Sequence, residues 1–168
     1  FENFFHRKKQ QLIWSQLSEL KKTTLIKSPK FVYAHFPIPH WPFVFAESGK
    51  LLEINFGKYS LNDCQIYGFV QSMKFISKEI TKVVDMILQK SSQPPIIIIQ
   101  GDHTVDYFTT STIKDRVYIL NALHLPNGGE KLLYQSISPI NNFRLILKHY
   151  FHIPIDLLPD RSYPVWQC

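Results

Sequence analysis

The sequence contains few cysteines and no long uninterrupted run of apolar residues. Its two cysteines, Cys64 and Cys168, cannot form a disulfide framework or a four-thiolate zinc site. No stretch approaches the roughly 18 to 20 consecutive apolar residues that a membrane-spanning helix needs. Internal repeats and low-complexity segments are absent as well. These absences exclude a disulfide scaffold, a four-cysteine zinc site and a membrane span within the sequence.

The remaining composition is typical of a globular domain with a large core. Hydrophobic residues make up 45% of the 168 residues and charged residues 19%, which argues against disorder. This length suits one ordinary domain or part of a larger one. The first residue is Phe1 rather than Met, which we interpret as the start of a processed or excised chain.

An excess of basic residues gives the chain a formal net charge of +6, from 19 Lys and Arg against 13 Asp and Glu. The densest basic runs are 7–9 and 21–22, and the other basic residues are scattered. No zinc-finger spacing and no RNP-like aromatic motif accompanies them, so nucleic-acid binding is not favoured. A solvated surface is the simplest interpretation. The alternative is attraction to an anionic membrane surface or an anionic substrate.

Hydrophobic periodicity predicts three helices and three strands. The helices are the segments in which apolar residues recur at spacings of three and four, namely 5–22, 61–89 and 141–151. Ser138 followed by Pro139 predicts the start of the third helix, as an N-cap and a first helical residue. The strands are short runs rich in β-branched and aromatic residues, namely 30–36, 96–100 and 116–123.

The order of these elements predicts an α/β fold. A strand, a helix and a second strand in succession imply a right-handed parallel crossover. The apolar run 96–100 is then a central parallel strand that is buried on both faces. We expect a three-layer, sandwich-like architecture with a mostly parallel sheet and flanking helices. Residues 1–29 would form an amino-terminal helix and connector, and residues 30–168 the α/β domain.

The loops that follow the predicted strands carry the candidate site, because ligands bind at the carboxyl ends of parallel strands. His40 follows the first strand, in a loop that three prolines stiffen. Asp102 and His103 follow the second strand, after Gly101, which lets the backbone turn. His124 follows the third strand, without a partner motif.

An adjacent carboxylate and imidazole could offer an oxygen and a nitrogen to one divalent cation, which makes Asp102 and His103 candidate metal ligands. The simpler alternative for this pair is a turn aspartate beside an exposed histidine. For His40 the alternative is a histidine packed within its loop.

Taken in order, four segments resemble sulfatase-like enzymes of the alkaline phosphatase superfamily. FVYAHFPIPHWPF resembles a strand and Pro-His-x-Pro loop of that group, and PPIIIIQGDHT its strand and Ser/Gly-Asp-His-Gly metal motif. RVYILNALHLP and ISPINNFRLILKHYF resemble the strand and helix that follow. The ending LLPDRSY is similar to the tail of a bacterial membrane-anchored subgroup. The resemblance covers roughly residues 30–163, which correspond to the carboxyl-terminal half of the family domain.

The resemblance implies a function for each candidate residue. Asp102 and His103 match the metal-ligand pair of the family, and His40 matches the histidine that contacts the ester or leaving group. The implied cofactor is a divalent ion, namely Mn, Mg, Ca or Zn. The implied substrate is an anionic phosphate or sulfate ester, with a membrane lipid or an envelope polymer as a further partner. The parent protein would lie on the extracytoplasmic face of the bacterial inner membrane, anchored by upstream helices.

The sequence departs from the family pattern at several positions. Neither the nucleophile nor the acidic metal ligand beside it has a match, and Cys64 lacks the Cys-x-Pro-x-Arg pattern of sulfatases. Thr104 replaces the usual glycine after the Asp-His pair. We therefore expect the carboxyl-terminal portion of a metal-dependent phosphoryl or sulfuryl ester hydrolase or transferase that is inactive by itself. The alternative is a non-catalytic binding module, and the oligomeric state stays open.

Overall fold

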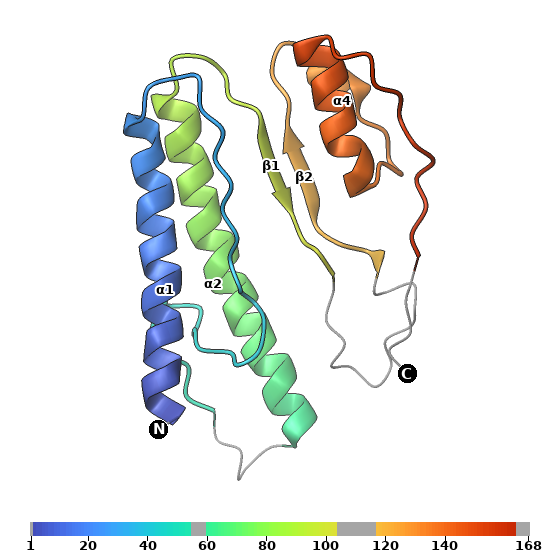
Figure 1. Cartoon of the computed structure of the whole chain (residues 1–168). Helices are drawn as coiled ribbons and strands as arrows, with labels where there is room; N and C mark the ends of the chain where they lie inside the picture. The colour runs from blue at the N-terminus through green and yellow to red at the C-terminus, as the bar shows by residue number, and fades with distance from the viewer. Residues whose placement is uncertain (1, 55–59, 104–116, 164–168) are drawn as a thin grey trace. The chain divides into compact units, whose positions relative to one another are not determined.

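The computed structural model describes residues 2–54, 60–103 and 117–163 (Figure 1). The chain forms two compact units, residues 1–92 and 93–168. In chain order the described elements are α1 (Glu2–Lys22), the short 3-10 helix η1 (Thr23–Leu25), α2 (Leu61–Lys90), β1 (Ile97–Gln100), β2 (Asn121–His124), the 3-10 helix η2 (Gly129–Leu132) and α4 (Pro139–Phe151). Among these helices, none combines the length and the apolar character that crossing a membrane requires. The predicted boundary between residues 29 and 30 is a different division of the chain and stays a prediction.

The three predicted helices are confirmed as α1, α2 and α4. Helix α1 begins three residues earlier than predicted, and α2 ends one residue later. Ser60 caps α2, because its hydroxyl oxygen accepts the Asp63 N–H at 3.1 Å, and its hydroxyl donates to Asp63 Oδ2 at 2.6 Å. Pro139 is the first residue of α4, as predicted.

The first unit consists of α1, α2 and the segment that returns between them, which we call the return segment (residues 26–52). The two helices run in the same direction, and the return segment runs back along them (Figure 1). Ile13 and Leu17 lie four residues apart on one face of α1, and both are fully buried. The buried apolar residues of this core come from all three parts: Ile13, Leu17, Val44, Phe45, Phe75, Ile76 and Val83.

Gly68 marks a close approach between α2 and the return segment. A Cβ atom at position 68 would lie 2.6 Å from Cδ2 and 2.9 Å from Cβ of Phe43. The Phe43 ring is itself buried, so it has no open space into which it could move. A glycine inside a helix costs about 1 kcal/mol relative to alanine. Its presence here is explained by the packing of Phe43 directly onto the helix backbone.

The predicted strand at 30–36 is absent, and this prediction was wrong. The segment is not paired in a ladder, and the polar side chains of α1 hold the return segment instead. Gln16 Nε2 donates to the His35 carbonyl at 2.8 Å, and Gln10 Nε2 donates to the Val44 carbonyl at 2.9 Å. β-Branched and aromatic residues favour an extended backbone, but a strand also needs a neighbouring strand. Within the described residues of this unit, the only β-pairing is the single bridge between Phe45 and Leu51.

The predicted three-layer sandwich with a mostly parallel sheet was also wrong. The described residues are 49% helical, and their one sheet has two antiparallel strands. In its register Ile97 lies opposite His124, and Gln100 lies opposite Asn121. A parallel crossover needs a strand on each side of a helix. Since 30–36 is not a strand, α2 connects no two strands.

The two strands of the second unit are shorter than predicted, and β1 is also less buried than predicted. Ile97 to Ile99 are half-buried and Gln100 is exposed, so β1 is not a central strand covered on both faces. The third predicted strand, at 116–123, is realised only as β2, and its first residue lies outside the described part of the chain. Helix α4 packs against this ribbon through a core of Leu125, Leu145 and Ile146. The half-buried Ile96, Ile98, Leu123, Leu133, Ile137 and Tyr150 surround that core.

Candidate functional site

Asp102 and His103 lie immediately after β1, as the sequence predicts. The Gly101 N–H donates to the Leu120 carbonyl at 2.9 Å, which continues the ladder one residue beyond the strand. Asp102 Oδ1 accepts the His103 N–H at 2.9 Å, and Asp102 Oδ2 lies 3.8 Å from His103 Nε2. Both side chains are largely exposed, at 79% for Asp102 and 61% for His103. The pair is therefore held by the backbone at the end of a strand and is accessible to solvent.

The geometry of this pair fits part of a metal site. Two ligand atoms that bind one cation at about 2.0 to 2.2 Å in tetrahedral geometry lie roughly 3.3 to 3.6 Å apart. The 3.8 Å between His103 Nε2 and Asp102 Oδ2 is close to that separation. No group of three or more His, Cys, Asp or Glu residues that could hold a metal ion occurs within 2–54, 60–103 and 117–163. The described residues thus supply two ligands of a candidate site, and Thr104 lies outside them.

Three side-chain amides anchor the strand ends next to the Asp102–His103 pair. We call Gln100, Asn121 and Asn142 the amide cluster. Asn142 of α4 is fully buried, and its Nδ2 donates to Gln100 Oε1 at 3.0 Å and to Asn121 Oδ1 at 2.7 Å. Sequence reasoning missed this cluster. The available signal was a polar Asn142 among the apolar positions of a predicted helix.

His40 is exposed, in the loop at 37–42 of the first unit. Its Nδ1 lies 2.6 Å from the Trp41 carbonyl oxygen. Because a carbonyl can only accept, Nδ1 carries the hydrogen, and in the neutral ring Nε2 is an acceptor. His40 is thus exposed rather than buried within its loop. Since His40 belongs to the first unit and Asp102 to the second, their predicted convergence stays a prediction.

Lys9 of α1 supports the loop that carries His40. Its Nζ donates to the His40 carbonyl at 2.6 Å and to the Pro42 carbonyl at 3.1 Å. Partial burial lowers the pKa of Lys9 to about 8, because a desolvated ammonium is less stable than a hydrated one. The sequence shows Lys9 only as one member of a basic run, so this contact could not be predicted.

Asp160, within the LLPDRSY segment, joins the tail of the chain to α4. Its carboxylate accepts hydrogen bonds from the Ser138 hydroxyl and N–H, from the Tyr134 hydroxyl at 2.6 Å and from Asn141 Nδ2 at 2.9 Å. The bonds from Ser138 and Tyr134 lower the pKa of Asp160 to about 2. The hydrogen bond to Asp160 also raises the pKa of Tyr134. In the described structure this aspartate therefore has a structural role.

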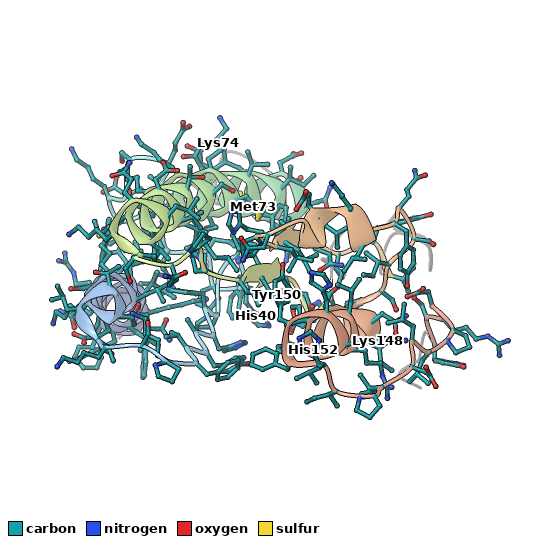
Figure 2. The ribbon with its side chains drawn as sticks, turned by 90° about the horizontal axis from the view of Figure 1, so that it is seen from above. His40, Met73, Lys74, Lys148, Tyr150 and His152 are labelled. Carbon is teal, nitrogen blue, oxygen red and sulfur yellow. The ribbon has the colours of Figure 1, made fainter. Side chains whose placement is uncertain are left out.

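The remaining histidines of the second unit are His124, His149 and His152. His124 Nδ1 donates to the Pro95 carbonyl at 2.8 Å, which ties the end of β2 to the residues before β1. His149 and His152 are exposed near the carboxyl end of α4, as predicted. Figure 2 labels His152 there together with Lys148 and Tyr150.

Comparisons of the chain with protein-family models, with curated proteins and with solved structures each find no match.

Proposed function

We propose that this chain is the carboxyl-terminal portion of a metal-dependent phosphoryl or sulfuryl ester hydrolase or transferase of the sulfatase-like kind. The observation that carries the proposal is the Asp102–His103 pair. It combines an exposed carboxylate and an exposed imidazole, 3.8 Å apart, directly after a strand. The resemblance of the sequence around this pair to a metal motif supports the same assignment. The proposal rests on this pair and its local sequence, because the described residues form an antiparallel ribbon rather than the parallel sheet that was expected.

In the proposed mechanism, Asp102 and His103 would hold a divalent ion, namely Mn, Mg, Ca or Zn. When bound, such an ion would supply charge neutralisation for the phosphoryl or sulfuryl oxygens and activation of an alkoxide nucleophile. From the resemblance alone, His40 would contact the ester or leaving group.

The chain supplies no residue that we assign as the nucleophile, so we propose that it is inactive by itself. From the resemblance alone, the natural partner would be a phosphate or sulfate ester carried by a membrane lipid or an envelope polymer. By the same argument the complete protein would act on the extracytoplasmic face of the bacterial inner membrane. Nucleic acid is not a favoured partner.

One observation favours a second candidate, a non-catalytic binding module. The described residues provide only two metal ligands, whereas stable metal sites have three or more. Such a module would keep the packing within each unit and lack the chemistry.

Binding of Mn²⁺ to the 168-residue chain, followed by electron paramagnetic resonance, tests the metal site. We expect Asp102→Ala and His103→Ala each to weaken binding at least about tenfold, because each removes one of two ligands. Asp156→Ala is the matched control, since it also removes an exposed carboxylate from the second unit. Unchanged affinity in Asp102→Ala and His103→Ala, or no binding by the unmodified chain, would sink the assignment.

Hydrolysis of p-nitrophenyl phosphate and p-nitrophenyl sulfate tests the proposed incompleteness. We expect no metal-dependent turnover by the chain above the rate in buffer, because it carries no assigned nucleophile. A longer protein that includes this chain should show turnover that depends on Asp102 and His40. Robust turnover by the chain alone contradicts the proposed incompleteness, and no turnover by the longer protein favours the binding module.

A further inference from the structure

The amide cluster contains a fully buried polar side chain in the core of the second unit. Asn142 has no exposed surface, although its neighbours in α4, Leu145 and Ile146, form the apolar core. Burying an amide is unfavourable unless its hydrogen bonds are made. The two Nδ2 hydrogens of Asn142 are both used, one for Gln100 Oε1 and one for Asn121 Oδ1. Asn142 therefore holds β1 and β2 at the same time.

These hydrogen bonds lie at one end of the two paired strands. Gln100 is the last residue of β1, Asn121 is the first residue of β2, and the two lie opposite each other. Asn121 Nδ2 also lies 3.4 Å from Asn142 Oδ1 and 3.4 Å from the Ile137 carbonyl. A one-residue shift of either strand would move its amide to the other face of the sheet. The cluster thus selects one register at the end of the ribbon from which the Asp102–His103 loop departs.

We propose that Asn142 is a positioning residue for the Asp102–His103 pair and that it acts through Gln100. The connection is short, because Gln100 is followed by Gly101, whose N–H is bonded to the Leu120 carbonyl, and then by Asp102. With Gln100 anchored to α4, the backbone that carries both proposed ligands starts from a fixed point. An apolar residue at position 142 could fill the same space but would not hold the side chain of Gln100. This inference rests on the proposed metal site.

Two measurements on Asn142→Ala test the inference. The first is Mn²⁺ affinity, which we expect to fall about tenfold, as is typical when a group that orients a ligand is lost. The second is the set of backbone amide resonances of residues 101–103 in the metal-free chain, which we expect to shift. Leu145→Ala is the matched control, since Leu145 is buried in the same helix and core but makes no bond to Gln100. It should lower stability and leave both measurements unchanged.

Gln100→Ala is a second variant that removes the same hydrogen bond. Because Gln100 is exposed, we expect this variant to fold even if Asn142→Ala does not. We expect Gln100→Ala to shift the same resonances, and we expect its effect on Mn²⁺ affinity not to add to that of Asn142→Ala. Unshifted resonances in a folded variant, additive effects or an equal effect of Leu145→Ala would overturn the positioning role. If the unmodified chain binds no Mn²⁺, the proposed metal site fails, while the resonances still decide whether Asn142 positions the loop.

Discussion

Replacing Phe75 with alanine is expected to lower the free energy of unfolding of the first unit by about 3 to 5 kcal/mol. Phe75 is 2% exposed, and its ring stacks on Phe45 with centroids 4.0 Å apart and an interplanar angle of 9°. The ring of Trp14 meets Phe75 edge-on at 5.1 Å. Phe75 therefore joins α1, α2 and the return segment, and its removal leaves a cavity at the point where all three parts meet.

Urea unfolding followed by amide hydrogen exchange in α1 and α2 measures this effect for the first unit alone. Tyr67→Ala is the control, because Tyr67 is also an aromatic residue of α2 but is 50% exposed. We expect its effect to stay within about 0.5 kcal/mol. Equal losses in the two variants would show that the aromatic contacts of Phe75 do not stabilise this unit.

The second large effect is expected from Asn141→Ala, in the second unit. Asn141 is fully buried, and its side chain bonds to both backbone groups of Leu158. Asn141 Nδ2 donates to the Leu158 carbonyl at 2.7 Å, and the Leu158 N–H donates to Asn141 Oδ1 at 2.9 Å. Its Nδ2 also lies 2.9 Å from Asp160 Oδ1. Each lost hydrogen bond contributes about 0.5 to 1.5 kcal/mol, and one to a charged carboxylate more, so we expect a loss of about 2 to 4 kcal/mol.

Hydrogen exchange in α4 and limited proteolysis of residues 153–163 report on this variant. We expect faster exchange of the Leu158 amide and faster cleavage of the tail, because both depend on its attachment to α4. Ile140→Ala is the control, since Ile140 is the neighbouring residue and is 52% exposed. A tail that stays protected in Asn141→Ala would show that Asp160 and its hydrogen bonds hold it without Asn141.

The helices of this chain were predictable because helical periodicity is a local property. The periodicity located α1 and α2, but it indicated their buried faces only in part, because Glu79 of α2 is buried whereas Ile66 and Val70 are exposed. The strands were less predictable. The segment 30–36 has strand-like residues but is bound by Gln16 of α1 rather than by another strand. Whether two strands pair in parallel or antiparallel depends on which distant segments of the chain become neighbours. The local composition of a strand does not specify those neighbours.

The candidate site also has a part that the sequence predicted and a part that it did not. The sequence by itself determined that a carboxylate and an imidazole, Asp102 and His103, stand side by side after an apolar strand, because adjacent residues remain adjacent in any fold. Only the tertiary structure decided what anchors them. Asn142 lies 42 residues from Gln100 and 21 from Asn121, and their amides meet only when α4 packs on the ribbon. That packing depends on the burial of apolar side chains from several distant segments at once, which no local pattern contains.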